Sequence, residues 1–372
     1  MAEVPPRRTI AFDPVLAAHE LESAAIEDLS QAQRHAQLFR ELFQRLRTEV
    51  GKRIVGQQEV VDLALTCLFA DGHLLLEGVP GLGKTLLIRA LAEATGVQFS
   101  RIQFTPDVMP ADITGTSVLT EDPVTLQRSI EFRPGPIFAQ LVLADEVNRA
   151  SPKTQSALLE AMQERSVSAA GETRPLGRPF FVMATQNPLE QEGTFPLPEA
   201  QLDRFLLKVI VPLTKREELH EVLSRTTRDG EGTLAQVVDP RGIQAAQKLA
   251  RRIPIAREVQ DWCVRLVLAT HPDSDCCPDD LRPFIRVGSS PRGAQAIVSS
   301  ARVCALMAGR FAVSFNDVRR VARAALRHRI HRSFEAEAEG ISNDTIAQRL
   351  IAAVPTLAPE ERSVPTDARG TR

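Results

Sequence analysis

Residues 78 to 85 read Gly-Val-Pro-Gly-Leu-Gly-Lys-Thr, a glycine and four residues followed by Gly-Lys-Thr. This spacing is the pattern of a phosphate-binding loop. Its glycines let the backbone curl so that several N–H groups point at phosphate oxygens. Lys84 can reach the β- and γ-phosphates of a nucleotide, and the Thr85 hydroxyl can ligate Mg²⁺. The segment is therefore predicted to bind nucleotide phosphates.

The segments on either side of this loop supply the context that the motif requires. Residues 73 to 77 form a short apolar run that is typical of a buried strand. Residues 86 to 94 are strong helix formers with an apolar face, and the N-terminus of that helix adds a positive dipole end at the phosphates.

Hydrolysis also requires a metal held in place and an oriented water. Asp145 and Glu146 end a third predicted strand that begins at Leu141, and strand ends are where open parallel sheets bind ligands. Asp145 can hold Mg²⁺ directly or through water, and Glu146 can polarise the attacking water. Asn187 ends a fourth strand and could hold the water or a γ-phosphate oxygen. The competing interpretations are helix capping for the acids, although Ser151 already caps the next helix, and a turn for Asn187.

Two arginines could supply a cation to phosphoryl transfer. Arg204 precedes a fifth predicted strand, where an arginine is more commonly just solvated. Arg292 opens a helix, and because cations do not favour helix N-termini, an anionic partner for Arg292 becomes more plausible.

Strands and helices alternate through the first part of the chain, which predicts an α/β fold with a five-stranded parallel sheet covered on both faces. The predicted strands are 73–77, 97–104, 141–146, 180–185 and 205–211, preceded by helices over 36–50 and 60–68. Hairpins are predicted within 117–132, turning at Asp122-Pro123, and within 167–176, turning near Ala170. After Pro212 the pattern indicates helices only, among them 245–253, 258–270, 293–308 and 316–329. We expect an N-terminal extension over 1–35, a core over 36–211, a helical domain over 212–352 and a disordered tail over 353–372.

The composition of the 372 residues is that of an ordinary globular protein, with 43% hydrophobic and 25% charged residues. The net charge of −2 creates no field that favours nucleic acid, and no apolar run reaches the ~18 residues of a membrane span. The N-terminus lacks the apolar core of a signal peptide. The five cysteines have the spacing of neither a zinc site nor a disulfide framework, which suggests a reducing cytoplasm.

Three stretches make the chain resemble the MoxR branch of the AAA+ ATPases over about residues 36–352. They are 144–150 followed by 153–155, 184–188 followed by 191–194, and 197–205. The resemblance implies a P-loop NTPase core followed by an all-helical lid domain. It also implies that residues 115–132 are the helix-2 insert and 165–176 the hairpin before sensor 1. Phe195 stands where the family often has Tyr, and Gly293 where it often has Ala.

The resemblance assigns roles to the residues above. Residues 78–85 are Walker A, Asp145 and Glu146 are Walker B, Asn187 is sensor 1, Arg204 the arginine finger and Arg292 sensor 2. The implied cofactors are ATP and Mg²⁺, with Thr85 and Asp145 on the metal. The implied nucleotide-binding residues are Val55, Gly56, Pro80, Gly81, Leu82, Gly83, Lys84, Thr85 and Asp145.

Family members form rings, typically hexameric, with ATP between subunits, and act as chaperone-like machines. They often work with a partner that carries a von Willebrand factor A domain. The resemblance thus implies an oligomeric ATPase that remodels or matures a partner protein.

Three other functions stay open from the sequence. A metal-chelatase motor subunit would share the same insertions. A nucleic-acid or transcription-associated ATPase could use helix 316–329, with Arg327, Arg329 and Arg332, to contact DNA, although a lid helix with a solvated basic end is the plainer interpretation. An inactive nucleotide-binding scaffold is disfavoured by the intact set of catalytic residues.

Overall fold

The computed structural model describes residues 29–121, 128–169, 171–188, 193–226 and 233–358. Its centre is a five-stranded sheet in the order β2-β5-β8-β1-β9, in which every neighbouring pair is parallel. This confirms the predicted five-stranded parallel sheet. The strands are β1 (Leu74–Glu77), β2 (Phe99–Gln103), β5 (Leu141–Asp145), β8 (Phe181–Gln186) and β9 (Leu207–Ile210).

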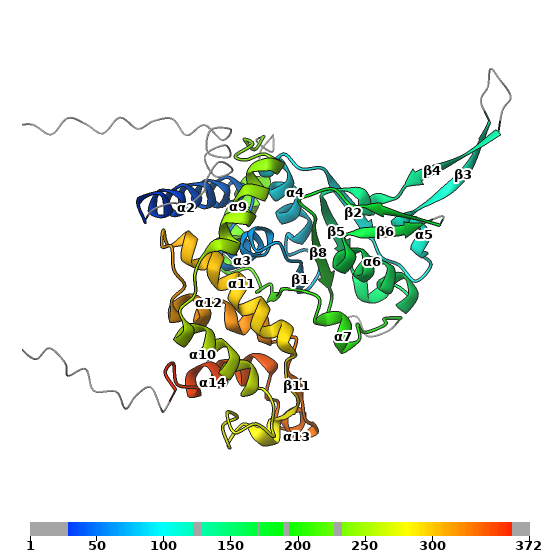
Figure 1. Ribbon diagram of the computed structural model, residues 1–372. Helices are drawn as coiled ribbons and strands as arrows, with labels where there is room; N and C mark the ends of the chain where they lie inside the picture. The colour runs from blue at the N-terminus through cyan, green and yellow to red at the C-terminus, as the bar shows by residue number, and fades with distance from the viewer. Residues whose placement is uncertain (1–28, 122–127, 170, 189–192, 227–232, 359–372) are drawn as a thin grey trace, which may run out of the picture.

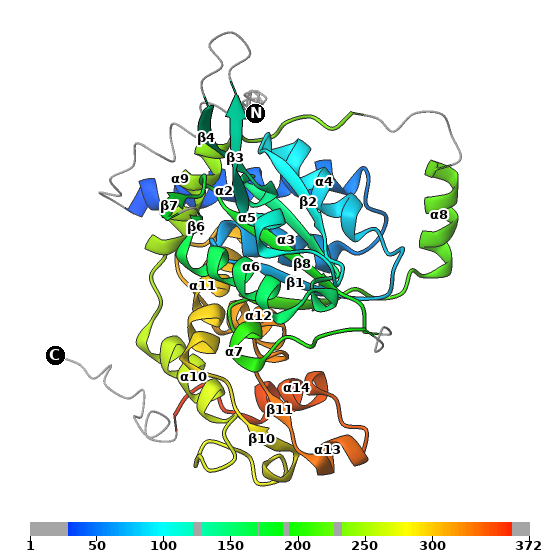
Figure 2. The same cartoon turned by 90° about the vertical axis from the view of Figure 1, so that its right-hand side faces the viewer.

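Successive residues of a strand point to opposite sides of the sheet. Because the strands carry apolar side chains on both sides, helices cover both faces. Leu74 and Leu76 pack into a core shared with three helices on one face, whereas Leu75 packs into a second core on the other face. The first face carries α2 (Leu29–Gly51), α3 (Gln58–Phe69) and α4 (Lys84–Thr95), and the second carries α5 (Pro110–Thr114) and α6 (Pro152–Glu164) (Figure 2). Helix α2 begins at Leu29 rather than at the predicted Ala36, since Ala32 is already buried.

Both predicted hairpins are present. Strands β3 (Gly115–Glu121) and β4 (Arg128–Pro134) pair antiparallel and project away from the body of the molecule (Figure 1). Strands β6 (Ser166–Ala169) and β7 (Glu172–Pro175) form the second pair. The predicted turn residues Asp122, Pro123 and Ala170 lie outside the described residues.

The chain after β9 is mainly helical, as predicted. Its helices are α8 (Arg216–Thr226), α9 (Pro240–Arg252), α10 (Arg257–Leu268), α11 (Pro291–Met307), α12 (Phe315–Leu326), α13 (Phe334–Ala338) and α14 (Asn343–Ala353). The prediction of helices alone missed one element, because β10 (Ile285–Val287) pairs with β11 (His331–Arg332). Strands this short carry no detectable alternation of apolar residues. The shorter remaining elements are α7 (Glu199–Leu202) and the 3₁₀ turns η1 (Pro136–Phe138), η2 (Val147–Arg149) and η3 (Arg282–Phe284).

The helical part packs directly onto the sheet-containing part. Side chains of α9, α10, α11 and α12 share one continuous apolar core with α2, α3 and α4. The buried Asp62 carboxylate of α3 pairs with Arg47 of α2 and Arg320 of α12, both at 2.9 Å. At the far end, Trp262 Nε1 donates to the carbonyl oxygen of Val354, so ordered packing continues just beyond residue 352. Most of the predicted tail, 359–372, lies outside the described residues, as do residues 1–28.

None of the helices in the described part of the chain combines the length and apolarity needed to cross a membrane.

Candidate active site

The phosphate loop lies between β1 and α4, where the sequence places it. Gly81 and Gly83 have φ angles of 85° and 76°, in the left-handed region that side chains with a Cβ rarely adopt. A Cβ on either glycine would meet open space, so the backbone angle rather than crowding explains the glycines. Lys84 Nζ donates to the Gly78 carbonyl oxygen at 2.5 Å, which holds the ammonium group over the loop.

The segment that contains Val55 and Gly56 lies beside this loop. Gln57 Nε2 donates to the Leu82 carbonyl oxygen at 3.1 Å. On its other side, a Cβ on Gly56 would come within 2.4 Å of the Glu218 carboxylate of α8. Residues 54–57 are thus held between the phosphate loop and α8, a position from which they could contact a nucleotide.

The two acids lie at the end of β5, and β8 separates β5 from β1 in the sheet. Thr185 of β8 links them, because its hydroxyl donates to Asp145 Oδ1 at 2.6 Å and accepts the Glu146 backbone N–H at 2.8 Å. Thr185 is fully buried. The sequence analysis gave it no role, although a hydroxyl in the apolar run of β8 was a visible signal. Asn187, which is also buried, follows β8 directly.

Both carboxylates are bound by cationic or polar side chains of the same chain. Arg101 of β2 donates from Nη2 to Asp145 Oδ2 at 2.7 Å. Glu146 Oε2 accepts from Arg149 Nη1 and from Gln103 Nε2, both at 3.0 Å. These arginines neutralise the acids, and the sequence analysis did not identify either of them.

The side chains of Thr85 and Asp145 are of the types that bind a magnesium ion. A threonine hydroxyl and a carboxylate are the hard oxygen ligands that Mg²⁺ uses together with phosphate oxygens and water. Asp145 Oδ2 is bound to Arg101, whose side chain is 43% exposed and can therefore be displaced towards solvent. Within the described ranges, no group of three or more His, Cys, Asp or Glu side chains is placed to hold a metal ion.

The two predicted arginines lie together in a different place. Arg204 and Arg292 line a cavity of about 320 Å³, here called the arginine pocket, with Arg165, Asp203 and Arg329 among its other lining residues. Among the described residues, the lining of this cavity includes neither the phosphate loop nor Asp145, Glu146 or Asn187. Within one chain, the structure therefore divides the predicted constellation into two groups.

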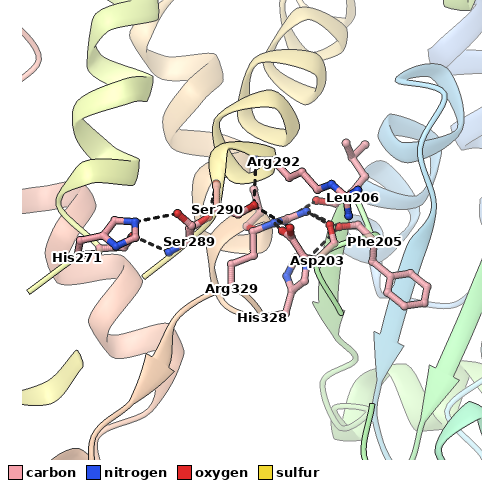
Figure 3. A network of polar contacts seen from close by, with 11 residues as sticks. Asp203, Phe205, Leu206, His271, Ser289, Ser290, Arg292, His328 and Arg329 are labelled. Atoms are coloured by element: carbon pink, nitrogen blue, oxygen red, sulfur yellow. Dashed lines mark hydrogen bonds and ion pairs between the residues drawn. The ribbon is translucent and has the colours of Figure 1, made fainter. Parts of the chain in front are cut away.

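Arg204 is held at the edge of this pocket. Its Nη1 donates to the Leu159 carbonyl oxygen of α6 at 2.6 Å, and its buried Nε has no hydrogen-bond partner among the described residues. Arg292 is exposed at the first turn of α11. Its backbone N–H donates to Ser290 Oγ, which in turn donates to Asp203 Oδ2 at 2.7 Å (Figure 3).

The end of α12 differs from its prediction. Arg327 and Arg329 are buried rather than solvated, at 7% and 4% exposure. Arg327 forms an ion pair with Asp344 at 2.9 Å, and Arg329 forms one with Asp203 at 2.7 Å (Figure 3). The sequence could not show this, because Asp203 lies 126 residues away from Arg329 along the chain. With both guanidinium groups engaged inside the protein, they are not available as a DNA-contacting surface.

Comparisons with known proteins agree with the fold of this chain. The family described as ATPase family associated with various cellular activities (AAA) matches residues 73–207, and the AAA lid domain matches 280–350. The chain is 42% identical over 306 residues to Uncharacterized protein YeaC of Bacillus subtilis, an alignment that covers 82% of this chain and 92% of that protein. It is 41% identical over 317 residues to Chaperone MoxR1 of Mycobacterium tuberculosis, covering 85% of this chain and 82% of that protein.

A solved structure also matches the fold. The crystal structure of a proposed ATPase from Cytophaga hutchinsonii has a TM-score of 0.81 and 37% sequence identity, and the match covers 88% of this chain and 98% of that chain.

Proposed function

The chain belongs to the MoxR family of AAA+ ATPases and hydrolyses ATP, and we propose that it works as a Mg²⁺-dependent ring in which a neighbouring subunit completes each active site. The observation that carries this proposal is the position of Arg204. It lines the arginine pocket with Arg292, away from the phosphate loop and the acids of its own chain.

A cation at the γ-phosphate stabilises the charge of phosphoryl transfer, and it can come from the same chain or from another. Arg204 is tied to α6 through Leu159 and borders an open cavity, so its guanidinium group can face an adjacent molecule. In a ring, the nucleotide of one subunit would then lie between its own phosphate loop and the arginine pocket of the next. Arg292 would act from the same side as Arg204.

The remaining roles in this proposal follow the side chains at the end of the sheet. Thr85 and Asp145 would hold the Mg²⁺, which when bound neutralises charge on the β- and γ-phosphates. Glu146 would polarise the attacking water and Asn187 would orient it. Residues 55–56, 80–85 and Asp145, all within the proposed core domain 36–211, would bind the nucleotide. The proposed lid domain over 212–352 follows this core.

The proposal also covers the process that ATP hydrolysis drives. One relative is named a chaperone, which supports a motor that remodels or matures a partner protein or complex. The proposed setting is the cytoplasm, with a hexameric ring and a partner that carries a von Willebrand factor A domain.

Mixing two inactive variants tests where Arg204 acts. Glu146→Gln keeps the shape of the side chain but removes the base, which should lower turnover by ~10²-fold or more while ATP still binds. Arg204→Ala should also bind ATP without turning it over. In mixed rings, some interfaces pair an intact Glu146 with an intact Arg204 from the neighbour, so steady-state phosphate release should return at a level that depends on the mixing ratio.

The matched control mixes Arg204→Ala with Arg204→Gln, which share one defect and should restore nothing. If Arg204 works inside its own subunit, no ratio of Arg204→Ala to Glu146→Gln restores activity. A monomeric protein in sedimentation with ATP and Mg²⁺ present would also contradict the proposal.

A further inference from the structure

The buried Arg329 of the helical lid binds the chain on both sides of Arg204. We propose that Arg329 is a positioning residue for Arg204, and that it makes the Arg204 segment move with the lid. This inference rests on the proposed function, in which Arg204 serves a neighbouring active site.

The contacts of Arg329 are concentrated on one segment. Its Nε donates to Asp203 Oδ1 at 2.7 Å, and its Nη2 donates to the carbonyl oxygens of Asp203 and Phe205 at 3.0 and 2.6 Å. Its Nη1 donates to the carbonyl oxygens of Leu206 at 3.2 Å and Ala325 at 2.5 Å. Four of these five hydrogen bonds reach residues 203–206, so the guanidinium group fixes the backbone immediately before and after Arg204.

Because Arg329 is buried, its charge has to be balanced by the ion pair and hydrogen bonds just described. Its side chain is 2% exposed, and a buried charge requires an ion pair and satisfied hydrogen bonds. The planar guanidinium group presents donors in a fixed geometry that matches several acceptors at once, which a lysine cannot do. Removing Arg329 would take a donor away from the Asp203 carboxylate and from four carbonyl oxygens, three of them on residues 203–206, and the backbone around Arg204 would have to rearrange.

A second lid element holds the same segment. Ser290, the residue before α11, donates from Oγ to the second oxygen of the Asp203 carboxylate at 2.7 Å. His328 Nε2 lies 3.1 Å from the Phe205 carbonyl oxygen. Asp203 is thus bound by Ser290, which caps the helix α11 that carries Arg292, and by Arg329, which follows α12 (Figure 3). Any rotation of the lid would therefore pull on Arg204 together with Arg292, against the hydrogen bond that ties Arg204 to the Leu159 carbonyl oxygen of α6.

Arg327 provides a matched control two positions earlier. It is also a buried arginine in an ion pair, but its partner is Asp344 of α14. Its carbonyl oxygen accepts from Asn343 Nδ2, also in the lid. Arg327→Gln should therefore cost lid stability without the loss of function that Arg329→Gln causes at Arg204.

The test asks whether Arg329→Gln behaves like a variant that lacks Arg204 or like one that lacks Glu146. The full-length variant should bind a fluorescent ATP analogue normally and lose ~10²-fold in turnover, since a misplacement of about 1 Å can cost that much. Mixed with Glu146→Gln it should regain activity, because its own Glu146 is intact and the other subunit supplies a well-placed Arg204. Mixed with Arg204→Ala it should regain none, because both subunits then lack a working Arg204. Arg327→Gln should keep its turnover.

The outcomes separate this inference from the proposal beneath it. If Arg204→Ala and Glu146→Gln fail to complement each other, the proposed function fails first. If that pair complements and Arg329→Gln does not complement Glu146→Gln, Arg329 is structural and the inference is wrong. If circular dichroism shows that Arg329→Gln is not fully folded, Arg329→Lys replaces it in the same mixing experiment. The lysine keeps the charge near Asp203 but cannot reach all of the carbonyl oxygens, so it should show the same pattern of complementation.

Discussion

The phosphate loop with its acids and the arginine pocket are built in different ways. The first is assembled from the ends of adjacent strands of one sheet, with Thr185 joining Asp145 to Glu146. The second is assembled across two parts of the chain, with Arg204 carried by a segment that Ser290 and Arg329 hold from the lid. In the proposed function, nucleotide binding is therefore a property of the sheet, whereas the cation for hydrolysis would depend on how the lid is oriented.

The largest effect expected from this comparison is the loss of Arg204. Arg204→Ala should lower turnover by ~10³-fold while nucleotide affinity changes little, because a missing cation of this kind acts on the transition state. Arg204→Lys should recover part of the loss, since it restores the charge but not the planar geometry. Phosphate release and equilibrium binding of a fluorescent ATP analogue would be measured on both. A large loss of affinity in Arg204→Ala would mean that the two regions are not separate in function.

The contacts of Thr185 test the first of the two regions, the phosphate loop with Asp145 and Glu146, here called the sheet side. Thr185→Val keeps the shape but leaves Asp145 Oδ1 and the Glu146 N–H without their partner. An unsatisfied polar group costs about 1–3 kcal/mol, so a loss of ~10-fold in turnover is expected from poorer placement of the acids. Thr185→Ser keeps the hydroxyl and should stay near the unsubstituted protein.

Mixing Thr185→Val with the other inactive variants shows whether its defect lies in the nucleotide site or in the arginine pocket. Because the defect lies in its own nucleotide site, Thr185→Val should regain activity with Arg204→Ala and regain none with Glu146→Gln. The reverse pattern would remove the distinction between the two regions.

Much of the sheet side could be predicted from the sequence. The phosphate loop is a contiguous motif, and Asp145 and Glu146 follow an apolar run, so local patterns indicate both the residues and the strand ends that carry them. The order of strands along the chain then indicated a parallel sheet with covered faces. Both features depend on neighbours close in sequence.

The residues that the sequence missed depend on distant neighbours. Arg329 and Asp203 are 126 positions apart, Arg101 and Asp145 are 44 apart, and Thr185 and Asp145 are 40 apart. Nothing in the local pattern around Arg329 distinguishes a buried guanidinium group from a solvated one. Pairing of this kind becomes visible only once the sheet order and the lid packing are known.

The smallest expected effect concerns Arg101, which forms an ion pair with Asp145 in the structure. Its Nη2 and Nε donate to Asp145 Oδ2 at 2.7 and 3.2 Å, on the oxygen that would face a metal. If Arg101 competes with Mg²⁺ for this carboxylate, Arg101→Met should lower the Mg²⁺ concentration needed for half-maximal turnover. A partly exposed ion pair is worth about 0.2–1 kcal/mol, which corresponds to about 1.4- to 5-fold.

The control is Arg128→Met, which removes an exposed pair with Glu121 on the β3–β4 hairpin and should leave the Mg²⁺ requirement unchanged. Titration of Mg²⁺ at saturating ATP gives the comparison directly. A higher Mg²⁺ requirement in Arg101→Met, or weaker nucleotide binding, would instead place Arg101 on the phosphates. The sheet side would then supply a cation of its own, and hydrolysis would depend less on the orientation of the lid than the position of Arg204 suggests.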